Sequence, residues 1–141
     1  MKINFNEMNE EALKEFNGGI GEFNAKIFND GDNKILLGRL KKNNSIGLHK
    51  HIDSCEIIYV LSGCGKMITD GEIEILNKGD ATYCPRNSSH TFVNENDEDL
   101  IFFAVVPKKG MWLTINNQVL NYKNFNKLIK PRLKILKLVI F

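Results

Sequence analysis

The chain has 141 residues, of which 43% are hydrophobic and 26% charged, and its net charge is +2. This length suits one globular domain with a real core and is too short for two ordinary domains. The longest clean apolar run, Ile101–Val106, is far shorter than the roughly 20 residues that cross a bilayer, so we expect no membrane span. The N-terminus lacks the apolar stretch of a signal peptide, and this predicts a cytoplasmic protein.

A short helix is predicted over residues 9–16. Asn9 can cap its N-terminus, and Ala12, Leu13 and Phe16 give an apolar stripe at helical spacing. Gly18 can end it. The helix and the strand after it make up residues 1–33 in the predicted organisation, followed by a core over residues 34–109.

The middle of the chain has the pattern of short strands separated by turns, with almost no helix between them. The strand-like segments cover residues 23–27, 35–40, 49–51, 55–61, 66–69, 72–76, 81–84, 91–93 and 100–106. Asp70-Gly71 is a two-residue hairpin signal between two of them. This succession predicts an all-β fold, an antiparallel sandwich or barrel, and excludes a βαβ organisation.

The three histidines of the chain, together with one glutamate, form a pattern of metal ligands. His49 and His51 lie two residues apart, so on a strand they point to the same face, about 6.6 Å apart along it. Glu56 follows after a gap long enough for a tight bend, and His90 comes from a separate strand. A carboxylate beside imidazoles suits Fe, Mn, Ni, Co or Zn. We therefore predict one divalent transition metal held by His49, His51, Glu56 and His90.

Two longer patterns enclose these residues. H-x-H-x4-E-x6-G runs from His49 to Gly63, and G-x5-P-x-N-x2-H-x3-N runs from Gly79 to Asn94. Together they resemble the two motifs of the cupin superfamily, over about residues 34–107. The resemblance implies an antiparallel jelly-roll or cupin β-barrel, with the same four residues as metal ligands.

The chain departs from the family pattern at two glycine positions. Asn43 stands where the first motif usually begins with glycine, and Asn87 stands two residues after the proline of the second motif. Asparagine is the non-glycine residue that best tolerates a left-handed backbone. Both replacements are therefore mild, and neither affects a ligand.

Several functions are compatible with such a site. Four protein ligands on an octahedral metal leave two positions open. The first hypothesis is an enzyme acting on a small polar molecule: an Fe- or Mn-dependent dioxygenase, or a metal-assisted isomerase or decarboxylase. The second is a sensor module that binds a sugar or metabolite without turnover. A third, a storage or structural role without metal, conflicts with the intact ligand set.

The surroundings of the site are less clear from the sequence. Tyr83 and Phe103 are candidates for the pocket wall, and Arg86 either binds an anionic substrate or is exposed to solvent. Next to the predicted ligand Glu56, Ile58 and Val60 share its face of the strand. The intervening residues Ile57, Tyr59 and Leu61 face the other way, into a sandwich or an interface.

The C-terminal segment differs in charge from the rest. All 17 acidic residues lie at or before Asp99, and residues 110–141 carry six basic residues and no acidic one. Thirteen basic against 17 acidic residues leave −4 for residues 1–109, against +6 for this basic extension. We expect it to form a homodimer interface or to cover the barrel. Poor order and contact with phosphates are the alternatives, although no nucleic-acid partner is expected because no recognition motif accompanies the charge.

Overall fold

The computed structural model describes residues 1–108, 114–115 and 118–119. The chain divides into two units, Met1–Lys109 and Gly110–Phe141. In the second unit, β11 (Thr114–Ile115) and β12 (Gln118–Val119) pair antiparallel. The roles predicted for the rest of residues 110–141 lie outside the described residues.

Residues 1–108 consist of two short 3₁₀ helices and ten strands. The helices are η1 (Phe5–Glu7) and η2 (Phe16–Gly18). The strands are β1 (Glu11–Lys14), β2 (Glu22–Asn29), β3 (Asn33–Leu40), β4 (Ser45–Lys50), β5 (Glu56–Ser62), β6 (Cys64–Thr69), β7 (Glu72–Asn77), β8 (Ala81–Cys84), β9 (Ser89–Val93) and β10 (Leu100–Pro107). No helix among the described residues has the length and apolar character that a membrane crossing demands.

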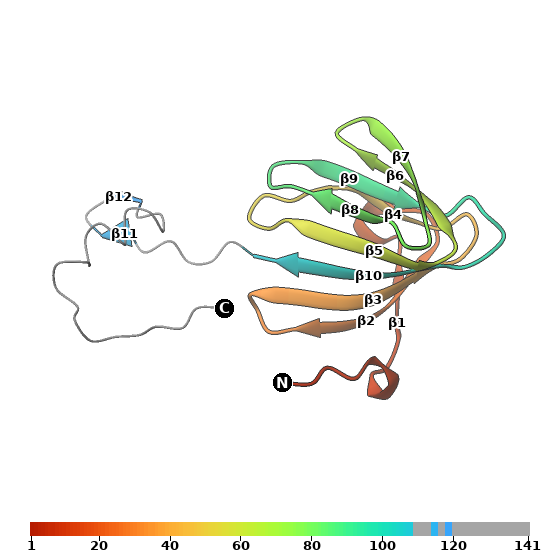
Figure 1. Cartoon of the computed structure of the whole chain (residues 1–141), viewed down its shortest axis with the longest axis horizontal. Coiled ribbons are helices and arrows are strands. Elements are labelled where there is room, and N and C mark those ends of the chain that lie inside the picture. Colours follow the sequence, from red (N-terminus) through yellow and green to blue (C-terminus); the bar gives the residue numbers. More distant parts are fainter. Residues whose placement is uncertain (109–113, 116–117, 120–141) are drawn as a thin grey trace. The chain divides into compact units, whose positions relative to one another are not determined.

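The ten strands form two antiparallel sheets (Figure 1). One has the order β1-β2-β3-β10-β5-β8, and the other has the order β4-β9-β6-β7. The predicted all-β, antiparallel fold is confirmed. Within residues 1–108, however, no hydrogen-bonded ladder joins the two sheets into a closed barrel. Each sheet instead buries one face against the other, which removes apolar surface from water without continuous pairing.

The helix predicted over residues 9–16 is wrong. Glu11–Lys14 is a strand, paired antiparallel with Glu22–Ala25 of β2. A helix of two turns forms few internal hydrogen bonds for its nucleation cost, whereas the edge of β2 offers a complete set of partners. Leu13 and Phe16, read as a helical stripe, still pack against the core.

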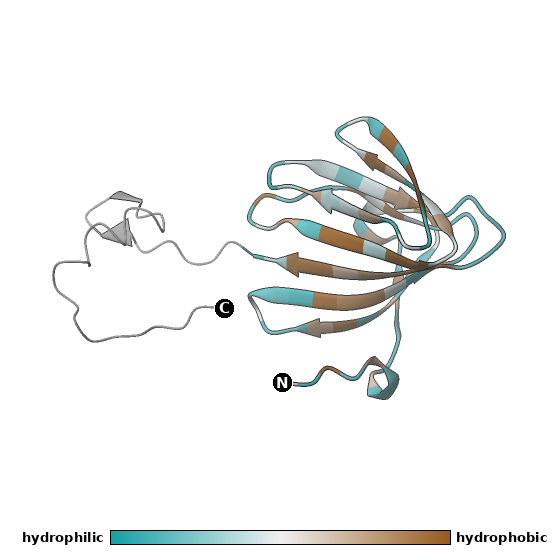
Figure 2. Cartoon of the chain, in the orientation of Figure 1, coloured by the Kyte–Doolittle hydropathy of each residue, from teal (hydrophilic) through white to brown (hydrophobic). Residues whose placement is uncertain are grey.

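The core lies between the inner faces of the two sheets. Phe23 of β2 stacks on Phe102 of β10 with ring centroids 5.9 Å apart, and Phe92 of β9 meets Phe102 edge to face at 5.3 Å. Gly38 of β3 leaves room for these rings, because a Cβ there would lie 2.6 Å from the Phe102 ring. Figure 2 shows hydrophobic residues along β3, β5 and β10 and hydrophilic residues in the turns. The Asp70-Gly71 turn joins β6 to β7 as predicted, with positive φ at both residues.

Candidate metal centre

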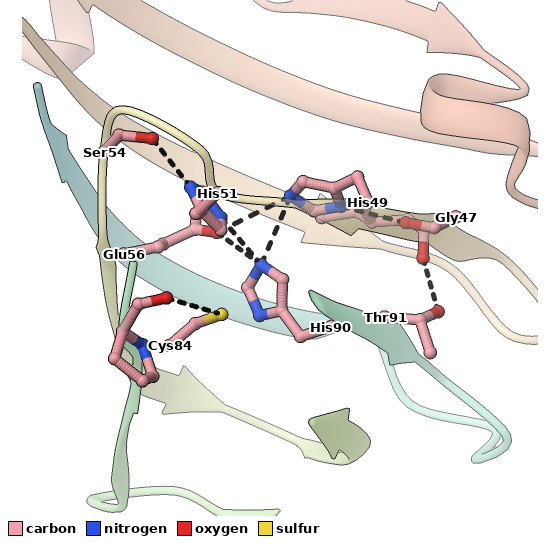
Figure 3. Close-up of polar contacts among 10 residues, drawn as sticks. Gly47, His49, His51, Ser54, Glu56, Cys84, His90 and Thr91 are labelled. Atoms are coloured by element: carbon pink, nitrogen blue, oxygen red, sulfur yellow. Dashed lines mark hydrogen bonds and ion pairs between the residues drawn. The ribbon is translucent and has the colours of Figure 1, made fainter. Parts of the chain in front are cut away.

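Three neighbouring segments bring the four predicted ligands together. His49 of β4 lies directly opposite His90 of β9 in the antiparallel ladder. Glu56 is the first residue of β5. His51 follows the end of β4, where its amide donates to the Ser88 carbonyl at 3.0 Å. Figure 3 shows the side chains of these four residues pointing toward one another.

The ligand atoms converge on one small volume. The Nε2 atom of His90 lies 3.0 Å from that of His51 and 3.2 Å from that of His49. The Oε2 atom of Glu56 lies 2.9 Å from Nε2 of His90, 3.2 Å from that of His51 and 4.0 Å from that of His49. One donor atom from each of the four residues lies within 4.8 Å of all the others.

The hydrogen-bond chemistry of this cluster suits a cation. The Nδ1 atom of His49 lies 2.9 Å from the Gly47 carbonyl oxygen, which can only accept. Nδ1 therefore carries the proton, and Nε2 presents its lone pair to the cluster. Nδ1 of His51 lies 2.9 Å from the Ser54 hydroxyl, which fixes that ring as well. Three imidazole nitrogens and a carboxylate oxygen facing one point are a donor set for a divalent transition metal.

The protonation states also favour metal binding. Burial alone would raise the pKa of Glu56, but hydrogen bonds with His51 and His90 outweigh it and lower the pKa to about 2. Burial lowers the pKa of His49. The site therefore presents an ionised carboxylate and a neutral imidazole near pH 7, which are the forms that ligate metals.

Two supporting residues were missed by sequence reasoning. Ser54 and Gly47 hold the outer nitrogens of His51 and His49, and nothing in the motif spacing distinguishes them. Gly47 also packs backbone to backbone against the η2 segment: a Cβ on Gly47 would lie 2.2 Å from the Asn17 carbonyl oxygen, and one on Gly19 would lie 2.2 Å from that of Ser45. The strand that carries His49 is thus held by the N-terminal segment.

The cluster opens into a cavity of about 540 Å³. The ligands His49, His51 and Glu56 line one part, and the apolar residues Phe16, Phe23, Ile27, Leu36, Ile46, Phe102 and Val106 line much of the rest. Polar residues complete the wall, among them Asn29 and Lys34. A cavity of this size and composition is typical of a small-molecule site.

The residues suggested for the pocket wall lie elsewhere. Tyr83 is 56% exposed, and Phe103 packs against Phe5 with ring centroids 6.2 Å apart. Arg86 is exposed and does not line the cavity. Tyr83 and Phe103 fall on the outer side of their strands, because the buried Cys84 and Phe102 next to them occupy the inner side.

The two asparagines at glycine positions adopt the expected backbone. The φ angle is 61° at Asn43 and 67° at Asn87, both in the left-handed region that asparagine tolerates. The amide of Asn87 also donates to the His51 carbonyl at 2.6 Å. The second motif therefore supports the loop that carries His51, a predicted ligand from the first motif.

The fold and these motifs place the chain in a known family. A family model described as "Cupin domain" matches residues 36–106, and the chain belongs to the cupin superfamily. A relative from Thermotoga maritima named oxalate-binding protein is 31% identical over 112 residues, which cover 75% of this chain and 93% of the relative.

Solved structures show the same fold. A crystal structure of a predicted oxalate decarboxylase from Thermotoga maritima superposes with a TM-score of 0.72 and 27% identity, covering 77% of this chain and 99% of that one. A cupin-superfamily sugar phosphate isomerase from Silicibacter pomeroyi superposes with a TM-score of 0.64 and 18% identity, covering 77% and 76% of the two chains. At that identity the second likeness concerns the fold alone.

Proposed function

We propose that the chain binds one divalent transition metal through His49, His51, Glu56 and His90, and that it binds a small chelating carboxylate at this metal. The observation that carries the proposal is the convergence of four donor atoms within 4.8 Å at the wall of a cavity of about 540 Å³. Fe, Mn, Ni, Co and Zn all suit three imidazoles and a carboxylate. The metal would act as a Lewis acid and orient a bound acid.

A carboxylate is favoured as ligand for two reasons. The two coordination positions that the protein leaves open on an octahedral ion suit the paired oxygens of a chelating acid. In addition, the relative with 31% identity is named for oxalate binding. The chain's own residues would fix the metal through Ser54 and Gly47 and keep the cavity largely apolar, which strengthens the interaction of charged oxygens with the ion.

The proposal is tested by loading metal-free protein with Mn²⁺, Fe²⁺, Co²⁺, Ni²⁺ or Zn²⁺ and measuring metal content, followed by calorimetric titration with oxalate. We expect one metal per chain and oxalate binding only by the loaded protein. His90→Ala and Glu56→Gln should each lower the metal affinity by at least about 100-fold, because loss of a ligand exceeds the 10- to 100-fold effect of its supporting partner.

The control variant is Glu72→Gln, an exposed residue of β7 outside the cluster. It removes the same charge and should keep full metal content. Protein that retains none of the five ions, or that loses its metal equally in Glu72→Gln and Glu56→Gln, would contradict the proposed site.

Turnover of the bound acid is a second candidate function. The similarity to a predicted oxalate decarboxylase favours decarboxylation, in which oxalate and a proton yield formate and carbon dioxide. Dioxygenase and isomerase activities are the other forms of the enzyme hypothesis. Formate release and oxygen uptake by the metal-loaded protein distinguish these reactions from binding alone, in which oxalate is recovered unchanged.

A further inference from the structure

One cation faces into the cavity from the six-stranded sheet. Lys34, in β3, is in phase with Leu36 and Leu40, whose side chains are buried in the core. Since alternate residues of a strand share a face, Lys34 points to the inner face as well, and it lines the cavity. It is exposed to solvent and forms no ion pair with any residue of the range 1–108.

Lys34 lies in the same cross-strand row as the metal ligand Glu56. On β10 its partner is Val106. The pairing of Val105 with Ile57, continued by one residue, places Val106 opposite Glu56. The row therefore runs Lys34, Val106, Glu56 across three neighbouring strands, which lie side by side in Figure 1.

The hydrogen bonds support this register and give the span. The Cys55 amide donates to the Pro107 carbonyl at 3.3 Å, as the continued ladder requires. Two strand spacings then separate the backbones of Lys34 and Glu56 by roughly 10 Å. The flexible four-carbon stem of Lys34 allows its ammonium group to extend toward Glu56. The apolar side chain of Val106 lines the cavity between these two residues.

The other charged residues of the cavity wall do not neutralise Lys34. Glu11 is opposite Ala25, whereas Lys34 is opposite Asn29. Those two positions of β2 are four residues, or about 13 Å, apart.

Lys50 also lines the cavity, but it alternates with the inward-facing His49 on β4, so its side chain leaves the strand on the opposite face. Of the two lysines that line the cavity among the described residues, Lys34 is the one whose side chain starts from an inward-facing strand position.

We propose that Lys34 determines ligand specificity by pairing with a second anionic group, a carboxylate or a phosphate, at the far end of an acid whose near end chelates the metal. This inference rests on the proposed function and narrows its substrate class. Oxalate has only two carbons, so oxalate bound to the metal has no free group to extend toward Lys34. The cavity of about 540 Å³ is in the range for considerably larger ligands.

The test uses the full-length, Mn²⁺-loaded protein and two matched pairs of acids. 2-Oxoglutarate and 2-oxopentanoate share a chelating 2-oxo acid, and only the first has a distal carboxylate. 3-Phosphoglycerate and glycerate share a chelating 2-hydroxy acid, and only the first has a distal phosphate. We expect the member with the distal anionic group in at least one pair to bind about two- to fivefold more tightly, the range for one solvent-exposed ion pair of favourable geometry. The pair that shows the preference identifies the anionic group.

Substitutions assign the preference to this residue. Lys34→Met should abolish it, Lys34→Glu should reverse it and Lys34→Arg should retain it, whereas the affinity for oxalate should change less than the affinity for the acid with the distal anionic group. Lys41→Met is the matched control, because it removes an equal charge from an exposed position away from the cavity. It should keep the preference.

The outcomes separate this inference from the proposed function. If oxalate binds but neither acid with a distal anionic group is preferred, or if Lys34→Met keeps the preference, the role of Lys34 is overturned and carboxylate binding at the metal stands. If the metal-loaded protein binds neither oxalate nor the longer acids, both the proposed function and the inference are wrong.

Discussion

The Nδ1 atom of His49 lies 2.9 Å from the carbonyl oxygen of Gly47, two residues earlier on the same strand. This hydrogen bond leaves Nε2 as the ring nitrogen whose lone pair points toward His51, Glu56 and His90. Gly47 is itself in contact with the backbone of Asn17 in η2. The orientation of a predicted metal ligand is thus set by a segment some thirty residues earlier in the chain.

Gly47→Ala should therefore lower both stability and metal affinity. A Cβ at this position would lie 2.2 Å from the Asn17 carbonyl oxygen, so the two segments must separate at a cost of about 1–3 kcal/mol. Chemical denaturation and metal competition measure the two effects. Leu48→Ala, at a neighbouring side chain that is 67% exposed, should change neither. Equal behaviour of the two variants would show that the contact does not constrain His49.

Ser54 should be needed for tight metal binding although it is not a ligand. Its hydroxyl lies 2.9 Å from Nδ1 of His51, and loss of such a partner typically costs 10- to 100-fold in metal affinity. We expect that loss in Ser54→Ala and its recovery in Ser54→Thr, which keeps the hydroxyl. Competition with a chromophoric chelator provides the measurement. A merely structural effect would lower the melting temperature of the metal-free protein as well.

The three cysteines are free thiols, and they should differ in reactivity. Burial, with a smaller contribution from the charge of Glu56, raises the pKa of Cys84 to about 11. At pH 8 almost none of this thiol is the reactive thiolate, whereas Cys55 and Cys64 are only half-buried. Alkylation followed by mass spectrometry should label Cys84 last in the native protein and all three alike in denaturant. Equal native rates would contradict the buried position of Cys84.

The outer face of the six-stranded sheet should mediate a homodimer. Ile57, Tyr59, Leu61 and Tyr83 are each between 39% and 56% exposed, so the alternative that the first three pack inside a sandwich is wrong. Contiguous exposed apolar residues typically mark an interaction surface. Light scattering should give a dimer for the full chain and a monomer for Tyr59→Lys. Ile73→Lys, at an exposed position of the other sheet, should remain dimeric.

Truncation after Lys109 distinguishes this face from the C-terminal segment. A truncated chain that is still dimeric supports the outer face as the interface. If the truncated chain is a monomer and the full chain with Tyr59→Lys is still a dimer, dimerisation is assigned to residues 110–141.

The sequence predicts the four residues of the candidate metal site better than it predicts the cavity around them. The four residues of the cluster could be predicted to meet because residues two apart on a strand share a face, and because the spacing to Glu56 and His90 follows a known motif. The segment Ile35–Leu40, by contrast, is apolar on both faces, so its alternation does not reveal which side is buried. The inward position of Lys34 follows from the burial of Leu36 and Leu40, which depends on how the two sheets pack.

The N-terminal helix was predicted wrongly for a related reason. The spacing of Leu13 and Phe16 is compatible with a helix, and the edge of β2 that captures Glu11–Lys14 is a tertiary feature. Local propensity is a weak guide where a neighbouring strand offers hydrogen-bond partners. The two asparagines at glycine positions were predictable, because their left-handed conformation depends on the residue itself.

The close approach of the η2 segment to β4, through Gly19 against Ser45 and Gly47 against Asn17, has a consequence for protein engineering. The family model begins at residue 36, yet Gly19, the ring of Phe23 and the ammonium group of Lys34 all precede it. Exchanging residues 1–35 between related chains should therefore alter which acids are accepted while the four ligands stay the same. A chimera of this kind would treat the first quarter of the chain as an interchangeable selectivity module on a constant metal-binding frame.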